Sequence, residues 1–255
     1  MDDAIKEGAY ARKQVGSRSR LISWSHGARF RIGLELSEGF AGKRVLDYGC
    51  GDGMYLALLM GSGSPPSKAV GAEVAKDLIE SNRRRFGGVP GLEFCTTESL
   101  RGAGVAGGFD AVVCMEVLEH LPDLDAYLDE FDRLLAPGGT LLISVPVETG
   151  LSTVIKQAVR TINGWRGVGD YPGTTPYTWL ELWKAVWAGE TQHIERPLHQ
   201  SAYGTRLHDH KGFNWKLLRA KMRRRFAVGE VRTSPVPWLP PFVASQVWIP
   251  AVKRR

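Results

Sequence analysis

One short segment constrains the fold of this chain more than any other, the run Asp47-Tyr48-Gly49-Cys50-Gly51-Asp52-Gly53. It follows an apolar stretch at residues 43–48 that is typical of a short buried strand, and an apolar stretch at 54–60 then predicts the start of a helix. Three glycines between a strand and a helix permit a tight turn in which a ligand approaches backbone N–H groups closely. The segment therefore predicts an α/β fold with a ligand-binding turn after its first strand.

Strand and helix patterns continue to alternate after this turn. The sequence predicts short strands at 69–74, 92–96, 109–115, 140–146, 226–234 and 243–252, and helices at 75–86, 124–135, 151–162, 178–187 and 213–225. Short apolar strands separated by helices indicate a mostly parallel sheet that is covered on both faces. In such sheets ligands bind at the carboxyl ends of the strands, so the residues at those positions are the candidates for chemistry.

Two carboxylates belong to this predicted binding edge. Asp47 precedes the first glycine of the turn, and Glu73 closes the second strand, 20 residues after Gly53. A dinucleotide fingerprint would need glycine where this chain has Met54, and Asp47 would repel a pyrophosphate. An acid at the position of Glu73 accepts hydrogen bonds from ribose hydroxyls. The pair suits a nucleoside with an ammonium group and no phosphate, which describes S-adenosylmethionine.

Four segments resemble, in order, the motifs of class I S-adenosylmethionine-dependent methyltransferases. They are VLDYGCGDGMYL, VGAEV, FDAVVCMEVLEHLPD and LLAPGGTLLISVP, and they span about residues 40–148. The similarity is closest to the broad type 11 group, which includes ubiquinone and menaquinone biosynthesis methylases. The resemblance implies an α/β fold with a Rossmann-like, seven-stranded, mostly parallel sheet, helices on both faces and an inserted lid region after the fifth strand.

The resemblance also implies which residues bind the cofactor S-adenosylmethionine. Asp47 and the glycine turn would hold its methionine end, Glu73 its ribose and Val74 its adenine. After the third strand the acid common in the family is replaced by threonine in this chain, so Glu98 or a backbone group would make the adenine contact. The full set expected to bind the cofactor comprises Asp47, Gly49, Cys50, Gly51, Gly53, Glu73, Val74, Thr97, Glu98, Cys114 and Met115.

Two residues are candidate catalysts on the acceptor side. His120 follows the fourth strand, near the expected methyl position, and imidazole titrates near neutrality. It is either a general base or a residue that orients the loop before Leu121-Pro122. Glu148 follows the fifth strand and either holds an acceptor amine or hydroxyl or begins the next helix. Methyl transfer is an in-line displacement, so a base is needed only when the acceptor loses a proton.

Other histidines leave further alternatives open. His208 and His210 are two residues apart, but no carboxylate pattern of known spacing accompanies them, so we expect no metal site and favour substrate contact or loop structure. His26 and Arg29 belong either to an N-terminal helix that caps the cofactor or to an ordinary surface helix.

The division of the chain follows from these motifs. We expect one methyltransferase domain over residues 1–255, with a helical cap at 1–39, the cofactor-binding core at 40–150, an inserted substrate or lid region at 151–212, and a helix and strand pair at 213–255 that complete the sheet. Three cysteines without a C-x-x-C pair indicate neither a disulfide scaffold nor a zinc site, and they favour a cytoplasmic location.

The last part of the chain bears on the acceptor. Residues 151–255 contain seventeen Lys and Arg against six Asp and Glu, and six aromatic residues of the insertion are candidates to line an acceptor pocket or to form a small accessory core: Trp165, Tyr171, Tyr177, Trp179, Trp183 and Trp187. Basic and apolar residues together suit an acceptor that is phosphorylated or lipid-linked, and peripheral contact with an anionic membrane surface. The alternative interpretation of the excess positive charge is an ordinary basic surface in contact with solvent.

The expected function is methyl transfer to a small-molecule acceptor, such as a lipid-linked, phosphorylated or glycosidic hydroxyl. The second hypothesis is an RNA methyltransferase. Nucleic acid is less favoured than a small molecule as the partner, because the sequence contains no appended RNA-binding motif. The third reading is a regulatory protein that binds S-adenosylmethionine without turnover. The oligomeric state does not follow from the sequence.

Overall fold

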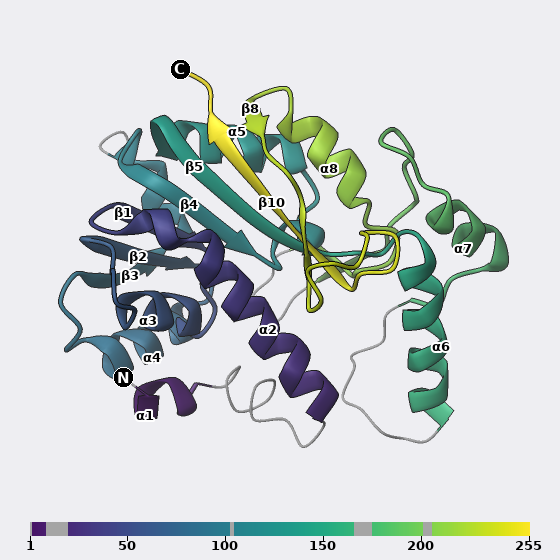
Figure 1. Cartoon of the computed structure of the whole chain (residues 1–255), viewed down its shortest axis with the longest axis horizontal. Helices are drawn as coiled ribbons and strands as arrows, with labels where there is room; N and C mark the ends of the chain where they lie inside the picture. The colour runs from purple at the N-terminus through teal and green to yellow at the C-terminus, as the bar shows by residue number, and fades with distance from the viewer. Residues whose placement is uncertain (1, 9–19, 103–104, 166–174, 201–205) are drawn as a thin grey trace.

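The computed structural model describes the backbone of residues 2–8, 20–102, 105–165, 175–200 and 206–255 (Figure 1). Its helices are α1 (Asp2–Lys6), α2 (Arg20–Leu36), α3 (Met54–Met60), α4 (Lys76–Phe86), α5 (Leu124–Leu134), α6 (Leu151–Trp165), α7 (Trp179–Val186) and α8 (Trp215–Met222), with 3₁₀ turns η2 (Glu38–Phe40), η3 (Thr97–Arg101) and η5 (Leu118–His120). Its strands are β1 (Arg44–Tyr48), β2 (Lys68–Glu73), β3 (Leu92–Thr96), β4 (Phe109–Met115), β5 (Leu135–Pro146), β6 (Leu198–Gln200), β7 (Arg206–His208), β8 (Phe226–Val228), β9 (Arg232–Ser234) and β10 (Gln246–Lys253). Tyr171 and the side chain of Trp165 lie outside the described part.

Five parallel strands form most of the sheet, in the order β3-β2-β1-β4-β5. β10 runs antiparallel along β5, and its other edge pairs with β8 and β9. The strand order reverses between β1 and β4, which creates a topological switch point where ligands bind beyond the carboxyl ends of the strands. The glycine turn follows β1 and therefore lies at this switch point.

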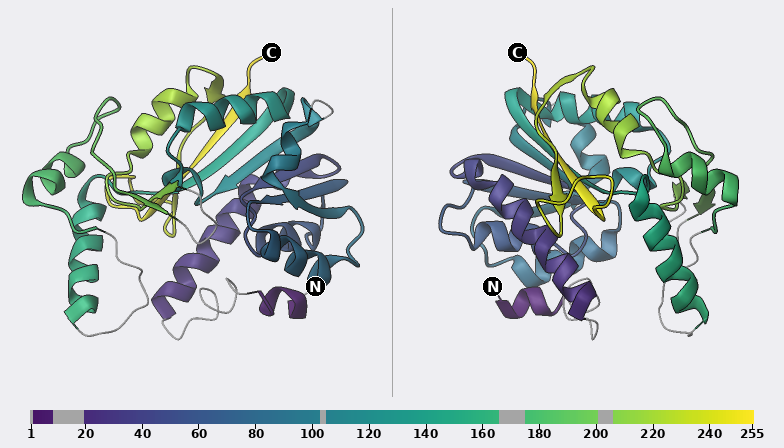
Figure 2. Two further views of the ribbon diagram at one scale, coloured as in Figure 1. Left: turned by 180° about the vertical axis from the view of Figure 1, so that it is seen from behind. Right: turned by 45° about the vertical axis from the view of Figure 1, so that its right-hand side comes forward.

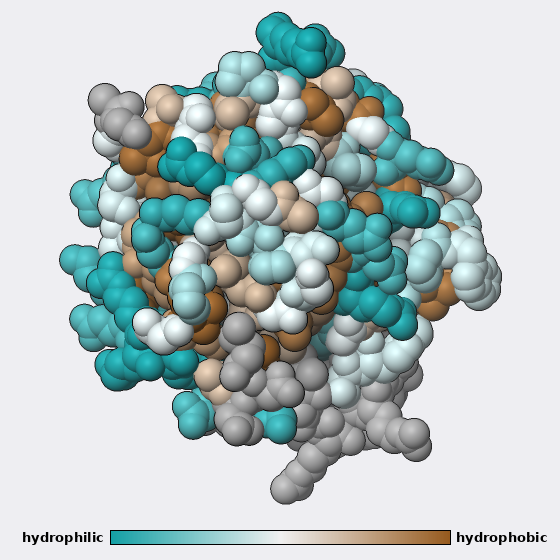
Figure 3. All heavy atoms as spheres, turned by 60° about the vertical axis from the view of Figure 1, so that its left-hand side comes forward, coloured by the Kyte–Doolittle hydropathy of each residue, from teal (hydrophilic) through white to brown (hydrophobic). Residues whose placement is uncertain are grey.

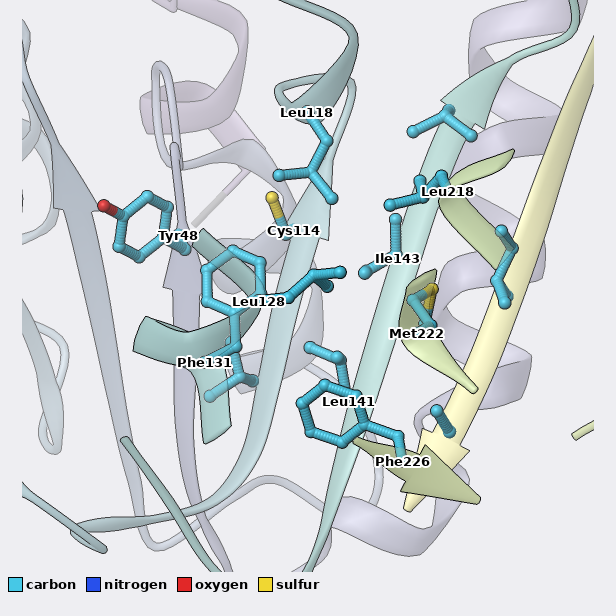
Figure 4. Packing of buried hydrophobic residues seen from close by; sticks show 14 of the residues in the cluster. Tyr48, Cys114, Leu118, Leu128, Phe131, Leu141, Ile143, Leu218, Met222 and Phe226 are labelled. Carbon is cyan, nitrogen blue, oxygen red and sulfur yellow. The ribbon is translucent and has the colours of Figure 1, made fainter. Parts of the chain in front are cut away.

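Apolar cores lie on both faces of the sheet. Figure 2 shows the helices that lie on either side of it. One core lies between the sheet and helices α5 and α8, and Figure 4 shows Leu128 and Leu218 within it. The other includes Tyr55 of α3 and residues of α1, α2 and α4. Val45 and Leu46 are neighbours on β1 and belong to opposite cores, because successive side chains of a strand point to opposite faces. The expected mostly parallel sheet with helices on both faces is confirmed.

The C-terminal strands differ from the expected pair. The stretch 226–234 was expected to be one strand, but it forms two short strands, β8 and β9, which pair with opposite ends of β10. The break contains Gly229 and lies beside Pro250, whose carbonyl accepts the Gly229 N–H at 2.8 Å. Proline has no N–H to donate to a ladder, which is a physical reason for the interruption. The described sheet therefore has eight strands rather than seven, and a separate antiparallel pair of strands, β6 and β7, was not expected.

Helix α5 offers a direct test of the core that positions the binding edge. Phe131 is fully buried, and its ring meets that of Tyr48 edge to face at 5.1 Å between centroids. We expect Phe131→Ala to lower the free energy of unfolding by about 3–5 kcal/mol, because it removes a packed ring and leaves a cavity. Asp129→Ala on the exposed side of α5 serves as the control in urea unfolding. Equal losses in the two variants would contradict this view of the core.

Candidate functional site

The glycine turn joins β1 to α3. Gly49, Gly51 and Gly53 all have positive φ angles, of 79°, 52° and 75°. A Cβ on Gly49 would lie 2.4 Å from Cγ2 of Val117, closer than side-chain carbons approach. Glycine at this position is thus required both by backbone conformation and by space.

Asp47 is the next-to-last residue of β1 and has a fully buried carboxyl group. Neither of its oxygens has a hydrogen-bond partner among the described residues. Burial and the nearby charge of Glu73 raise the pKa of Asp47 to about 8. Buried polar groups in proteins are nearly always hydrogen-bonded, so an unpartnered carboxyl beside an open glycine turn fits a ligand that brings donors and positive charge. The ammonium group of S-adenosylmethionine meets this requirement.

Glu73 closes the turn from the end of β2. Its carboxylate accepts the N–H of Gly51 at 3.0 Å, that of Val74 at 2.7 Å and, more weakly, that of Ala75 at 3.4 Å. A carboxylate has about four lone-pair positions, so these three backbone bonds leave about one position for a ribose hydroxyl. Val74 is 52% exposed, as a residue free to receive an adenine ring would be. Both assignments stay predictions, and the geometry is compatible with them.

A pocket of about 200 Å³ opens above the turn. Its lining residues come from the turn, from the start of α3, from the end of β4 and from α2: Arg29, Phe30, Gly49, Cys50, Gly51, Asp52, Met54, Tyr55, Met115 and Glu116. Because Arg29 and Phe30 belong to α2, the N-terminal helix covers this pocket rather than lying elsewhere on the surface.

The remaining cofactor candidates lie in different surroundings. Cys50 and Met115 line the pocket, which is compatible with their predicted contacts with the cofactor. Cys114 is fully buried in the core on the α5 side, as Figure 4 shows, and it is not among the residues that line the pocket. Thr97 and Glu98 begin η3, where Glu98 is exposed, and neither lines the pocket. Their contacts with a cofactor therefore remain predictions without geometric support in this structure.

Glu116 is a pocket residue that the sequence analysis missed. It is a non-glycine residue with a positive φ of 54°, and its carboxylate accepts a hydrogen bond from Nε2 of Gln246 at 2.5 Å. The guanidinium of Arg29 lies 3.9 Å from the same carboxylate and 2.6 Å from Nδ1 of His26. Burial and the charge of Arg29 lower the pKa of His26 to about 4, so this imidazole is neutral at pH 7. The spacing E-x-x-E-H that ends at His120 is the signal that could have drawn attention to Glu116.

His120 lies at the end of η5, beyond β4. Its Nδ1 is 2.9 Å from the backbone carbonyl oxygen of His208. A carbonyl only accepts hydrogen bonds, so Nδ1 carries the proton and Nε2 of the neutral ring keeps its lone pair. The second nitrogen of His120 is thereby prepared to accept a proton.

His210 and Glu119 lie beside His120. The His120 and His210 rings have centroids 4.8 Å apart, and the ligand atoms of Glu119, His120 and His210 all lie within 4.8 Å of one another. Among the residues that the structure describes, these three side chains form a group that could also hold a metal ion, although the sequence predicted none. His208 contributes its carbonyl, while its own ring bonds to the carbonyl of Pro197.

Glu148 is fully buried just beyond β5. Its carboxylate accepts a hydrogen bond from Nζ of Lys156 at 3.0 Å, and the same ammonium reaches the carbonyl oxygens of Val147 at 2.9 Å and Ser245 at 3.0 Å. The pair ties α6 to the ends of β5 and β10. An acceptor-binding role for Glu148 stays a prediction, and its ion pair gives it a structural role as well.

The sheet order, the glycine turn at the switch point and the buried acid before it define the class I S-adenosylmethionine-dependent methyltransferases. The model of a protein family that is described as "Methyltransferase domain" matches residues 23–214, which is most of the chain. The protein belongs to this family, and S-adenosylmethionine is its cofactor.

Similar proteins agree with this placement. The ubiquinone biosynthesis O-methyltransferase of Xanthomonas oryzae pv. oryzae (strain PXO99A) is 37% identical over 111 residues, which cover 41% of this chain and 43% of that protein. The enzyme of the same name from Methylococcus capsulatus is 32% identical over 114 residues, covering 44% and 46%. The chain thus spans less than half the length of these curated relatives. The PH0226 protein of Pyrococcus horikoshii OT3 shares the fold, with a TM-score of 0.62, 13% identity and 98% of each chain covered.

The carboxyl of Asp47 predicts a change in cofactor affinity. We expect Asp47→Asn to weaken the binding of S-adenosylhomocysteine by about 10- to 100-fold, the loss typical of one charge-assisted hydrogen bond. The exposed Asp77→Asn, on the first turn of α4, is the control. Calorimetric titration measures the affinity, and an unchanged dissociation constant in Asp47→Asn would show that this acid does not hold the cofactor.

The same residue predicts a dependence of stability on pH. Without cofactor the native state keeps the Asp47 proton up to about pH 8, whereas the unfolded chain loses it near its ordinary pKa of 3.8. The native state therefore binds more protons between these values, and this group lowers stability as the pH rises. Asp47→Asn removes the effect, so its stability relative to wild type should increase from pH 5 to pH 8 in urea unfolding. A difference that stays constant with pH would contradict the raised pKa.

Proposed function

We propose that the protein methylates a hydroxyl group of a small-molecule acceptor and that His120 accepts the proton released. The observation that carries this proposal is the 2.9 Å hydrogen bond from Nδ1 of His120 to the His208 carbonyl, which leaves Nε2 as a free base beyond β4. The names of the curated relatives, which are O-methyltransferases, support a hydroxyl as the acceptor.

The residues of the chain would divide this work as follows. Asp47, Glu73 and the glycine turn bind the cofactor, which when bound supplies an electrophilic methyl group. Arg29 and Glu116 cover the pocket from α2 and β4. Holding donor and acceptor in line accounts for up to about 7–11 kcal/mol of a reaction barrier, so positioning is the main task of these residues. A positioned base adds about 10²–10⁴-fold.

Residues 1–255 act in this proposal as one methyltransferase domain, with 151–212 as the region that meets the acceptor. We further propose a cytoplasmic location, supported by Cys50, Cys95 and Cys114, which are all free thiols. No helix among the described residues is long and apolar enough to cross a membrane.

Helix α7 supports the proposal of peripheral contact with an anionic membrane. Trp179 and Trp183 of α7 are 89% and 65% exposed, and Trp187, the residue after the helix, is 62% exposed, while Ala185 of α7 is buried. In Figures 1 and 2, α6 and α7 lie beyond the sheet at the end where the acceptor pocket is expected. The face drawn in Figure 3 mixes hydrophilic and hydrophobic residues. By contrast, the exposed residues at positions 179, 183 and 187 are all tryptophans. Tryptophan favours the membrane–water interface, so these side chains suit a lipid surface.

Replacement of these three tryptophans tests the membrane proposal. We expect the triple variant Trp179→Ser, Trp183→Ser and Trp187→Ser to lose co-sedimentation with phosphatidylglycerol-containing vesicles, because the apolar rings no longer enter the interface. Trp24→Ser, an exposed tryptophan on α2, is the control. Wild-type protein that fails to sediment with these vesicles at low salt would remove the membrane from the proposal.

A labelling experiment tests the function itself. The purified protein and methyl-labelled S-adenosylmethionine are added to lipid, polar small-molecule, RNA and protein pools of a cell extract. We expect label in a hydroxyl-containing small molecule or lipid, and loss of that label with His120→Ala. Label in RNA would favour the RNA methyltransferase reading. Cofactor binding without label in any pool would favour a regulatory protein that binds S-adenosylmethionine.

A further inference from the structure

Three polar groups beyond β4 have hydrogen-bonding capacity that the described residues do not use. Both carboxyl oxygens of Glu119 are buried and have no hydrogen-bond partner in the described part of the chain. Nε2 of His120 lies 3.8 Å from Oε1 of Glu119, too far for a hydrogen bond. The ring of His210 completes the group. A buried carboxyl without a partner calls for an explanation, and a bound polar ligand supplies one.

Arg196 brings His210 to this place. Its Nη2 donates to the carbonyl oxygens of Glu119 and, at 3.0 Å, of Asp209, and its Nε donates to that of Lys211 at 3.3 Å. One guanidinium therefore joins the backbone of η5 to the residues on both sides of His210. A planar fork of N–H groups can make three such bonds at fixed angles, which the single ammonium of lysine cannot reproduce.

The surroundings of His210 keep its ring neutral. Burial and the neighbouring His120 and Lys156 lower its pKa, against the opposing effects of Glu148 and Glu116, and the result is a pKa of about 4. Burial and the charge of Glu116 raise the pKa of Glu119 well above its ordinary value. The neutral ring of His210 therefore lies beside a carboxyl group whose protonated form is favoured by burial. A neutral imidazole also offers one donor and one acceptor nitrogen.

We propose that His210 is a second acceptor-binding residue, which donates a hydrogen bond to the hydroxyl oxygen while His120 takes its proton, and that Arg196 is the positioning residue for both. This inference rests on the proposed function. The O–H bond of the acceptor breaks and its proton goes to Nε2 of His120. The electron pair stays on oxygen and bonds the methyl carbon, whose former bonding pair leaves with the sulfur. Positive charge passes from the sulfonium to the His120 imidazolium, beside the carboxyl of Glu119.

The proposed roles of His120 and His210 predict how variants of these two residues differ in their rates of label transfer. His210→Ala should lower the rate of label transfer by about 10²–10³-fold, the loss typical of one donor to a developing oxyanion. His210→Gln should recover at least about tenfold of this loss, because its amide keeps a donor. The double variant His120→Ala and His210→Ala should be less than about tenfold slower than the slower single variant, because residues that act as a unit are not additive. His193→Ala, an exposed histidine of the same segment, is the control.

Arg196→Lys tests the positioning role separately. This substitution keeps the positive charge but removes the planar set of N–H donors. We therefore expect a lower kcat, a changed pH profile of kcat and an unchanged affinity for S-adenosylhomocysteine. Unchanged cofactor affinity in every variant also shows that the fold is intact. A variant that lowers cofactor affinity in parallel with its rate would indicate general damage and would contradict the specific role.

The outcomes distinguish this inference from the function on which it rests. No transfer by the wild-type protein in any pool contradicts the proposed function and this inference together. If the wild-type protein transfers label and the rate of His210→Ala lies within twofold of the rate of His193→Ala, the result contradicts this inference alone. Loss of transfer with EDTA and recovery with zinc or magnesium ions would assign Glu119, His120 and His210 to a metal ion, and would also overturn the role of His210 as a donor to the acceptor.

Discussion

The binding edge of this protein depends on one buried carboxyl group without a protein partner. Asp47 lies near the end of β1, the strand that lies between β2 and β4, with apolar cores on both faces. Burying such a group unpaired destabilises the native state, and Glu73 adds repulsion once Asp47 ionises. The packed sheet must therefore supply the free energy that holds this carboxyl in place. A cationic ligand relieves the same cost, so binding and stability are linked through one side chain.

Local patterns explain why so much of the core was predictable from the sequence. Glycine spacing, apolar period and strand ends are properties of short segments, and they placed Asp47, Glu73 and Met115 at one edge of the sheet. The resemblance assigns both Cys114 and Met115 to the cofactor, and the structure places these two residues in different surroundings. Neighbours on a strand point to opposite faces, and Cys114 points into the core with α5 while Met115 lines the pocket. A motif names positions, whereas the period of the strand decides which side chains can reach a ligand.

The acceptor side could not be predicted in the same way because its contacts join distant segments. His120 and the carbonyl of His208 are 88 residues apart in sequence, and Arg196 is 77 residues from Glu119. No periodicity reports such contacts, so the sequence offered only alternatives for His120 and for the pair His208 and His210. The division of residues 226–234 into β8 and β9 was missed for a related reason. It depends on Pro250, whose effect appears only when β10 is placed beside Gly229.

The structure also changes what the basic charge of residues 151–255 means. Much of that charge is used inside the molecule: Lys156 binds Glu148, Lys211 binds Glu181 at 3.0 Å, and Arg196 binds backbone carbonyls. These cations are engaged in contacts within the molecule and are not free to attract an anionic partner. The prominent exposed groups of α7 are instead its tryptophans. Contact with a membrane would then depend more on burial of aromatic rings than on charge, and its affinity should fall only modestly as salt screens the remaining surface charges.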